Sequence, residues 1–239
     1  ERLSYAWRLV ALGATPPRLP AAYGMEGVYE LRQPDDAARL RSAAADAFSA
    51  IVIGGGYIGL EVAATLAKSG KDVTVIEAAP RLLARVASPA ISAFLAYLHA
   101  DAGTTMITDA GVEDIAADHG GFSHVTLSDG RQLSADMLVV GIGVTPVTAL
   151  AEAAGIETGN GILVDAGMQT SVAGIYAIGD GALQRDSAYG IRIESVHNAQ
   201  DSAERAAAAI NGHAPPAVQA PWFWSEQFGL RLQSAGIIP

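Results

Sequence analysis

The 239 residues include no cysteine. Without cysteine, they can form neither a disulfide framework nor a thiolate metal site, and they hold no thiol that could act as a catalyst. No apolar run reaches the about 18 residues that a membrane-spanning helix needs. No basic segment followed by an apolar one opens the chain, as in a secretion signal. Together these absences predict a cytoplasmic protein with no membrane segment.

Positive charge is also scarce. The 15 Lys and Arg residues are outnumbered by 25 Asp and Glu residues, so the formal net charge is −10. No basic stripe of the kind that binds a phosphate backbone is present, so nucleic acid is not an expected partner. The five histidines do not cluster at metal-ligand spacing, and no metal site is predicted.

Hydrophobic residues make up 50% of the chain, and apolar strand-like runs alternate with helical patterns. This alternation predicts an α/β protein whose parallel sheet carries helices on both faces. An Asp-Gly pair at residues 129–130 predicts a hairpin. The expected strands lie at residues 9–12, 50–53, 72–76, 137–140, 162–164 and 175–178. The expected helices lie at residues 35–48, 60–68, 88–100 and 196–210.

The clearest unit lies at residues 51–77, where a strand, a glycine turn, a helix and a second strand follow one another. Gly54, Gly56 and Gly59 match the pattern G-x-G-x-x-G in the structural context that a dinucleotide fingerprint requires. The first glycine permits the tight turn, the second lets the backbone approach a pyrophosphate, and the third lets the helix pack closely on the strand. The free N–H groups at the helix start would hold the phosphates.

An acid at the end of the second strand, Glu77, indicates which dinucleotide binds. Its carboxylate can accept hydrogen bonds from the ribose hydroxyls and would repel a 2′-phosphate, which favours NADH. NADPH stays open, because Arg81 and Arg85 could reach a phosphate. The NAD contacts predicted in this unit are Gly54, Gly55, Gly56, Tyr57, Ile58, Gly59 and Glu77.

A second apolar strand, Ile175–Ile178, ends in Gly179 and Asp180. An acid at such a place can bind a sugar hydroxyl, although an ordinary turn is an equal alternative for these residues taken alone. Three landmarks, Val10–Pro16, Gly54–Glu61 and Thr170–Asp180, occur in the order seen in two-dinucleotide-binding flavoprotein reductases, which the chain therefore resembles.

Within that superfamily the chain is most similar to the FAD-dependent NADH:ferredoxin reductases of bacterial oxygenase systems. The most specific segment is Pro-Trp-Phe-Trp-Ser-Glu-Gln at residues 221–227, and segments 80–85, 139–144 and 192–199 also match. The resemblance implies a Rossmann-like NAD-binding domain, residues 21–147, inserted in a second Rossmann-like, FAD-binding domain, residues 1–20 and 148–215. Residues 216–239 would begin an α+β C-terminal interface domain. The chain is expected to be part of a longer protein, for which a homodimer is an option.

The resemblance also implies roles for individual residues. Glu61 would lie near the nicotinamide carboxamide, with Glu194 as the matching acid from the flavin side. Trp224 would pack near the isoalloxazine, Asp180 would bind the ribityl chain, and Arg85 would pair with an NAD phosphate or the adenine ribose. The remaining cofactor contacts would be Gly141, Gly143, Ala11, Gly13 and Gly179.

The chemistry implied by this resemblance is hydride transfer from NADH to FAD, followed by single-electron transfer to a ferredoxin-type iron–sulfur protein. Two alternatives stay open at this point. One is a related flavoenzyme, such as an NADH oxidase, a rubredoxin reductase, a nitrite reductase or an apoptosis-inducing-factor-like protein. The other is a non-catalytic NAD-binding module.

Overall fold

The computed structural model describes residues 4–17, 19, 20, 22, 24–186 and 190–237. The outer ends of the first and last predicted domains, residues 1–3 and 238–239, lie outside this set. The chain divides into two compact units. The first comprises Glu1–Thr15, Val144–Trp224 and Gln233–Ile237, and the second comprises Pro16–Gly143, Ser225–Leu232 and Ile238–Pro239.

The second unit is built on a five-stranded parallel sheet in the order β3-β10-β4-β5-β6. The chain leaves β4 for β5 on one side and returns to β10 on the other. The strand order therefore reverses beside β4, which is where open α/β sheets bind ligands at the carboxyl ends of their strands. The strands are β3 (Val28–Tyr29), β10 (Met137–Val140), β4 (Ser49–Ile53), β5 (Asp72–Ile76) and β6 (Thr105–Ile107).

Three helices cover one face of this sheet, α1 (Pro34–Asp46), α2 (Tyr57–Lys68) and α3 (Pro89–Asp101). They bury a core around Val52, Leu60 and Val75. The apolar side chains of α2 and α3 recur at helical spacing, so each helix turns one stripe to the strands.

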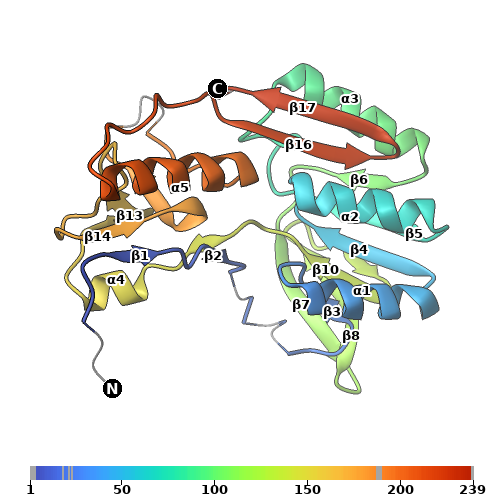
Figure 1. Cartoon of the computed structure of the whole chain (residues 1–239). Helices are drawn as coiled ribbons and strands as arrows, with labels where there is room; N and C mark the ends of the chain where they lie inside the picture. The colour runs from blue at the N-terminus through green and yellow to red at the C-terminus, as the bar shows by residue number, and fades with distance from the viewer. Residues whose placement is uncertain (1–3, 18, 21, 23, 187–189, 238–239) are drawn as a thin grey trace. The chain divides into compact units, whose positions relative to one another are not determined.

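The opposite face is covered by strands, so the expectation of helices on both faces is wrong for this unit. An antiparallel sheet of β7 (Val112–Asp118), β8 (Gly121–Leu127) and β9 (Gln132–Ser134) packs there, with Val125 and Leu127 against Ile51 and Leu138. Figure 1 draws β7 and β8 as the long yellow-green pair. An antiparallel sheet with one apolar face can cover a parallel sheet as a helix does, since it too exposes only its polar side to water.

The first unit has shorter strands. β1 (Arg8–Val10) pairs in parallel with β14 (Ile175–Ala177), and α5 (Val196–Ile210) packs Ala206 into the core beside Tyr176. The Ser195 hydroxyl caps α5 by accepting a hydrogen bond from the Asn198 amide at 3.1 Å. The remaining elements are β2 (Ala14–Thr15), β11 (Thr145–Pro146), α4 (Ala149–Ala153), β12 (Thr158–Gly159), β13 (Gly161–Val164), the 3₁₀ turn η1 (Gly179–Gly181) and β15 (Ala182–Gln184).

Several predicted boundaries differ from the structure by one to three residues, most of all at the start of α2. α2 begins at Tyr57 and not at Leu60, with Gly56 in an extended conformation as its N-cap. The first N–H groups of a helix have no hydrogen-bond acceptor within the helix. A helix can therefore begin inside the glycine pattern, directly after Gly56. The first strand ends at Val10, two residues early, because Gly13 soon turns the backbone with a φ of +67°. In the part of the chain that the structure describes, no helix has the length and apolar character to cross a membrane.

The predicted start of a C-terminal domain is a hairpin of β16 (Trp222–Gln227) and β17 (Leu230–Ala235). Its turn residues, Phe228 and Gly229, both have positive φ, as a tight hairpin turn requires. The tip of the hairpin belongs to the second unit, where the Phe228 ring meets the fully buried His99 ring edge-on at 4.8 Å. His99 Nε2 lies 2.8 Å from Gln227 Oε1.

We expect His99 to make the protein less stable in mild acid. Burial lowers the pKa of its imidazole, and the hydrogen bond to Gln227 opposes that shift. The unfolded chain therefore binds a proton near pH 6.5 that the folded chain does not, and stability is lost as the pH falls below that value. Urea unfolding between pH 7.5 and 5.5 should show a slope of at most about 1.4 kcal/mol per pH unit from this group.

The matched variant is His99→Gln, whose amide can donate to Gln227 without titrating. Its pH slope over the same range should be smaller, whatever its stability at pH 7.5. Asp36 and Asp136 do not interfere, because hydrogen bonds to backbone N–H groups lower the pKa of each and they titrate in stronger acid. An equal slope in the variant would contradict this assignment.

Candidate functional site

The glycine turn of the second unit lies in close backbone contact with the loop after β10 and with the start of α2. A Cβ on Gly54 would stand 2.3 Å from the Gly141 carbonyl oxygen, and one on Gly59 would stand 2.0 Å from the Gly54 oxygen. Gly54 also has a φ of +109°. The Gly141 amide donates to Ile53 at 2.8 Å, which joins the ends of β10 and β4. Only glycine fits at both turn positions, so the predicted close packing of the helix on the strand is present.

Gly56 differs, because a Cβ there would meet nothing within 4 Å. It stands at the start of α2, where the first amide to donate to it is that of Leu60, at 3.0 Å. The amides of Tyr57, Ile58 and Gly59 lie before the first i→i−4 hydrogen bond of the helix, so they have no acceptor within it. Open space in front of a helix N-terminus, with N–H groups directed outward, fits the pyrophosphate of a dinucleotide.

Glu77 follows β5 and its carboxylate braces the turn. Its Oε2 accepts from the Gly55 amide and its Oε1 from the Ala79 amide, each at 2.7 Å. Each carboxylate oxygen can accept more than one hydrogen bond, so these contacts are compatible with a ribose hydroxyl as a further donor. Glu77 therefore lies next to the glycine turn, as expected, and also holds the turn in shape.

The two arginines after Glu77 differ in their surroundings. Arg81 is held in its own loop, where its guanidinium donates to the Ala87 oxygen at 2.7 Å and to Ser92 Oγ at 2.8 Å. Arg85 is exposed, and its Nη2 lies 3.6 Å from the position of a Cβ on Gly143. The structure thus brings Arg85 to the loop after β10, while Arg81 stabilises the approach to α3.

Glu61, on α2, contacts the tip of the C-terminal hairpin. Its Oε1 accepts from the Ser225 hydroxyl at 2.6 Å and from the Glu226 amide at 3.3 Å. The sequence marked residues 221–227 as characteristic but assigned no role to Ser225. No local sequence pattern connects Ser225 with Glu61, because they lie 164 residues apart.

The predicted flavin contacts of the first unit gather at one edge. β1 and β14 run in parallel with Val10 beside Ala177, so Ala11 and Gly13 follow one strand where Gly179 and Asp180 follow the other. A Cβ on Gly181 would stand 3.0 Å from the Gly13 oxygen. The Gly179 amide donates to the buried Ser202 hydroxyl of α5 at 3.0 Å, a support that sequence reasoning missed.

Arg192 connects Glu194, another predicted site residue, with the turn at Gly179 and Asp180. Its side chain is buried, Nη1 donates to the Asp180 carbonyl oxygen at 2.6 Å, and Nη2 lies 2.6 Å from Glu194 Oε1. Glu194 is therefore ion-paired and stands near the Gly179–Asp180 turn. Trp224 packs on Trp222 with ring centroids 5.2 Å apart. Arg192 was predicted only as one residue of the matching segment 192–199.

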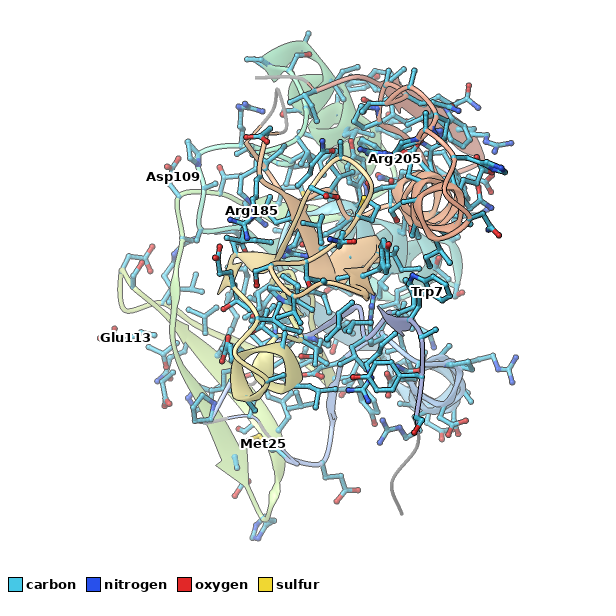
Figure 2. The ribbon with its side chains drawn as sticks, turned by 60° about the vertical axis from the view of Figure 1, so that its left-hand side comes forward. Trp7, Met25, Asp109, Glu113, Arg185 and Arg205 are labelled. Atoms are coloured by element: carbon cyan, nitrogen blue, oxygen red, sulfur yellow. The ribbon has the colours of Figure 1, made fainter. Side chains whose placement is uncertain are left out.

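Further polar contacts lie in the first unit. Arg205 of α5, labelled in Figure 2, lies 3.7 Å from Asp201 and borders a cavity of about 50 Å³, enough for a water molecule or two. His197 lies 3.3 Å from Gln219. Within the described residues, no group of three or more His, Cys, Asp or Glu side chains could hold a metal ion.

A parallel sheet with a glycine turn at its order reversal and an acid ending the next strand defines a Rossmann-like dinucleotide-binding unit. The model of the pyridine nucleotide-disulphide oxidoreductase family matches residues 1–203. The chain belongs to this family.

Within this family, the chain is similar to several individual reductases. The chain is 40% identical over 242 residues to rubredoxin-NAD(+) reductase of Pseudomonas putida, covering 100% of this chain and 63% of that protein. It is similar to putidaredoxin reductase in a covalent complex with putidaredoxin, with 40% identity, a TM-score of 0.92, and coverage of 98% of this chain and 58% of the other. A ferredoxin reductase from Rhodopseudomonas palustris is 42% identical with a TM-score of 0.93, covering 98% and 59%. The chain thus spans about six tenths of these relatives' length.

Proposed function

We propose that the protein transfers a hydride from NADH to FAD and passes the electrons singly to a ferredoxin-type iron–sulfur protein. The observation that carries the proposal is the glycine turn braced by Glu77, in a chain about 40% identical to rubredoxin and putidaredoxin reductases. The two cofactors supply the redox chemistry, and the chain's own residues bind and orient them.

On the NAD side, the amides of residues 57–59 would hold the pyrophosphate, and Glu77 would accept hydrogen bonds from the adenine ribose. The exposed guanidinium of Arg85 offers a countercharge beside Gly143. Glycine at positions 141 and 143 lets the loop after β10 approach a ligand closely. We assign residues 21–147 to this NAD-binding domain.

On the flavin side, the turn after β1 and the turn after β14 would approach FAD together. Ala11, Gly13 and Gly179 leave the backbone accessible, and Asp180 would bind the ribityl hydroxyls. Arg192 would hold both this turn and Glu194 in place. We assign residues 1–20 and 148–215 to the FAD-binding domain and residues 216–239 to the start of a C-terminal domain, with Trp224 beside the isoalloxazine.

The relatives support the proposed class of partner. Putidaredoxin reductase has been seen in a complex with putidaredoxin, which supports an iron–sulfur protein as the electron acceptor here. A cytoplasmic location is part of the proposal, in keeping with NADH as the reductant. A homodimer stays a prediction.

We expect the protein that carries this chain to be yellow, to be bleached by NADH without oxygen, and then to reduce a small ferredoxin. Flavin absorbance followed by ferredoxin absorbance would measure the two steps. A colourless protein that binds NADH would instead support a non-catalytic NAD-binding module. A yellow protein that reduces oxygen or disulfides but no ferredoxin would support one of the related flavoenzymes.

A further inference from the structure

Three consecutive hydrogen bonds join the buried His99 to Glu61, all inside the second unit. His99 Nε2 lies 2.8 Å from Gln227 Oε1, Gln227 Nε2 donates to Ser225 Oγ at 3.0 Å, and Ser225 Oγ donates to Glu61 Oε1 at 2.6 Å. The four side chains come from α3, β16 and α2. We call these three bonds the relay.

The donors of the relay all point the same way. Because the Gln227 amide nitrogen donates to Ser225, its oxygen is the acceptor for His99, and His99 Nε2 carries the proton. The single Ser225 proton then goes to the Glu61 carboxylate. His99 Nδ1 is buried and has no hydrogen-bond partner among the described residues, which fits a neutral ring with an unprotonated Nδ1.

Burial keeps this arrangement in place. His99, Ser225 and Gln227 are each at most 2% exposed. Breaking one bond would leave a polar group unsatisfied away from water, which is costly, so each side chain holds its neighbour in a single orientation. The relay therefore ends on Glu61 as a rigid support.

That support engages only one side of the carboxylate. Both the Ser225 hydroxyl and the Glu226 amide bind Oε1, and within the described residues no donor reaches Oε2. Glu61 lies one helical turn after Tyr57, near the N-terminal end of α2, which follows directly on the glycine turn. Oε2 is thus held as an acceptor near the proposed dinucleotide site.

We propose that Ser225 and Gln227, backed by His99, are positioning residues that fix Glu61 so that Oε2 accepts a hydrogen bond from the carboxamide of a bound nicotinamide. This rests on the proposed function, which puts NADH on the glycine turn. The residues act by orientation alone, and no proton or electron moves along the relay. A carboxylate held in its binding orientation loses less freedom when the ligand arrives, which raises affinity.

The test compares NADH with ADP-ribose, which has the same adenosine and pyrophosphate but no nicotinamide. Ser225→Ala should weaken NADH binding to the chain about 10-fold, the equivalent of one charged hydrogen bond. Its affinity for ADP-ribose should stay within about twofold. Ser225→Thr keeps the hydroxyl and should restore NADH binding, and Ser123→Ala on β8 is a matched control outside the relay. Titration calorimetry gives both affinities, and near-UV circular dichroism checks the fold.

A double-mutant cycle separates positioning from a general structural role. In a Glu61→Ala background, Ser225→Ala should cause no further loss of NADH affinity. Three outcomes would each overturn the positioning role: equal weakening of NADH and ADP-ribose binding, additivity with Glu61→Ala, or unchanged NADH binding in Ser225→Ala. None of them would contradict the proposal that the wild-type chain binds NADH. A wild-type chain that binds neither ligand would contradict the proposed function, and the relay's role with it.

Discussion

Gly59→Ala is expected to lower the free energy of unfolding by about 3 kcal/mol or more. A Cβ on this residue would stand 2.0 Å from the Gly54 carbonyl oxygen, so α2 would have to move away from β4. That movement would open the core around Leu60 and Val52, both fully buried. Urea unfolding followed by circular dichroism measures the loss, and a variant as stable as the wild type would contradict the close packing.

Gly56→Ala is the matched variant, and it should separate binding from stability. Its Cβ would enter open space, and a φ of −81° suits alanine, so stability should fall by no more than about 1 kcal/mol, the cost of a poorer N-cap. NADH affinity should fall about 10-fold or more, because the methyl group would stand where the pyrophosphate approaches. Unchanged NADH affinity in this variant would exclude the glycine turn as the pyrophosphate site.

Glu77→Arg is expected to move the ratio of NADH to NADPH affinity at least about 10-fold toward NADPH. The change removes a carboxylate that would repel a 2′-phosphate and puts a guanidinium in its place. It also leaves the Gly55 and Ala79 amides without the acceptor they have now, so affinity for both dinucleotides should fall. The ratio of the two dissociation constants is therefore the measurement.

Glu77→Ala serves as the control for that second effect. It loses the brace without adding a cation, so its preference for NADH should relax without reversing. Arg81 should not compensate, since its guanidinium is held by Ala87 and Ser92. If the Arg variant kept the wild-type ratio, Glu77 would have no part in selecting the dinucleotide.

Much of the second unit was predictable because its signals are local. The strand at 50–53, the glycine turn and the acid at 77 lie within 30 residues, and each needs a particular residue type for reasons of backbone geometry. The strand predicted at residues 137–140 was also confirmed, as was the helix predicted at residues 196–210 in the first unit. The start of α2 was missed because a glycine can be either turn or N-cap.

Contacts between residues that lie far apart in the sequence had no local sequence signal. The packing of the antiparallel sheet on the second face of the parallel sheet could not be predicted. The sequence of the short strands at residues 112–134 does not indicate which surface they pack against. The bonds of Ser225 to Glu61 and of Arg192 to Asp180 join segments whose separate patterns carry no record of each other.

The sequence by itself determined the family landmarks of this chain, and it predicted a dinucleotide-binding turn and an acid suited to NADH. Only the tertiary structure decided that Glu77 braces the turn it follows and that the hairpin tip holds Glu61. The physical reason is that backbone conformation depends on neighbouring residues, whereas a buried hydrogen bond depends on which distant surfaces come together when the chain folds.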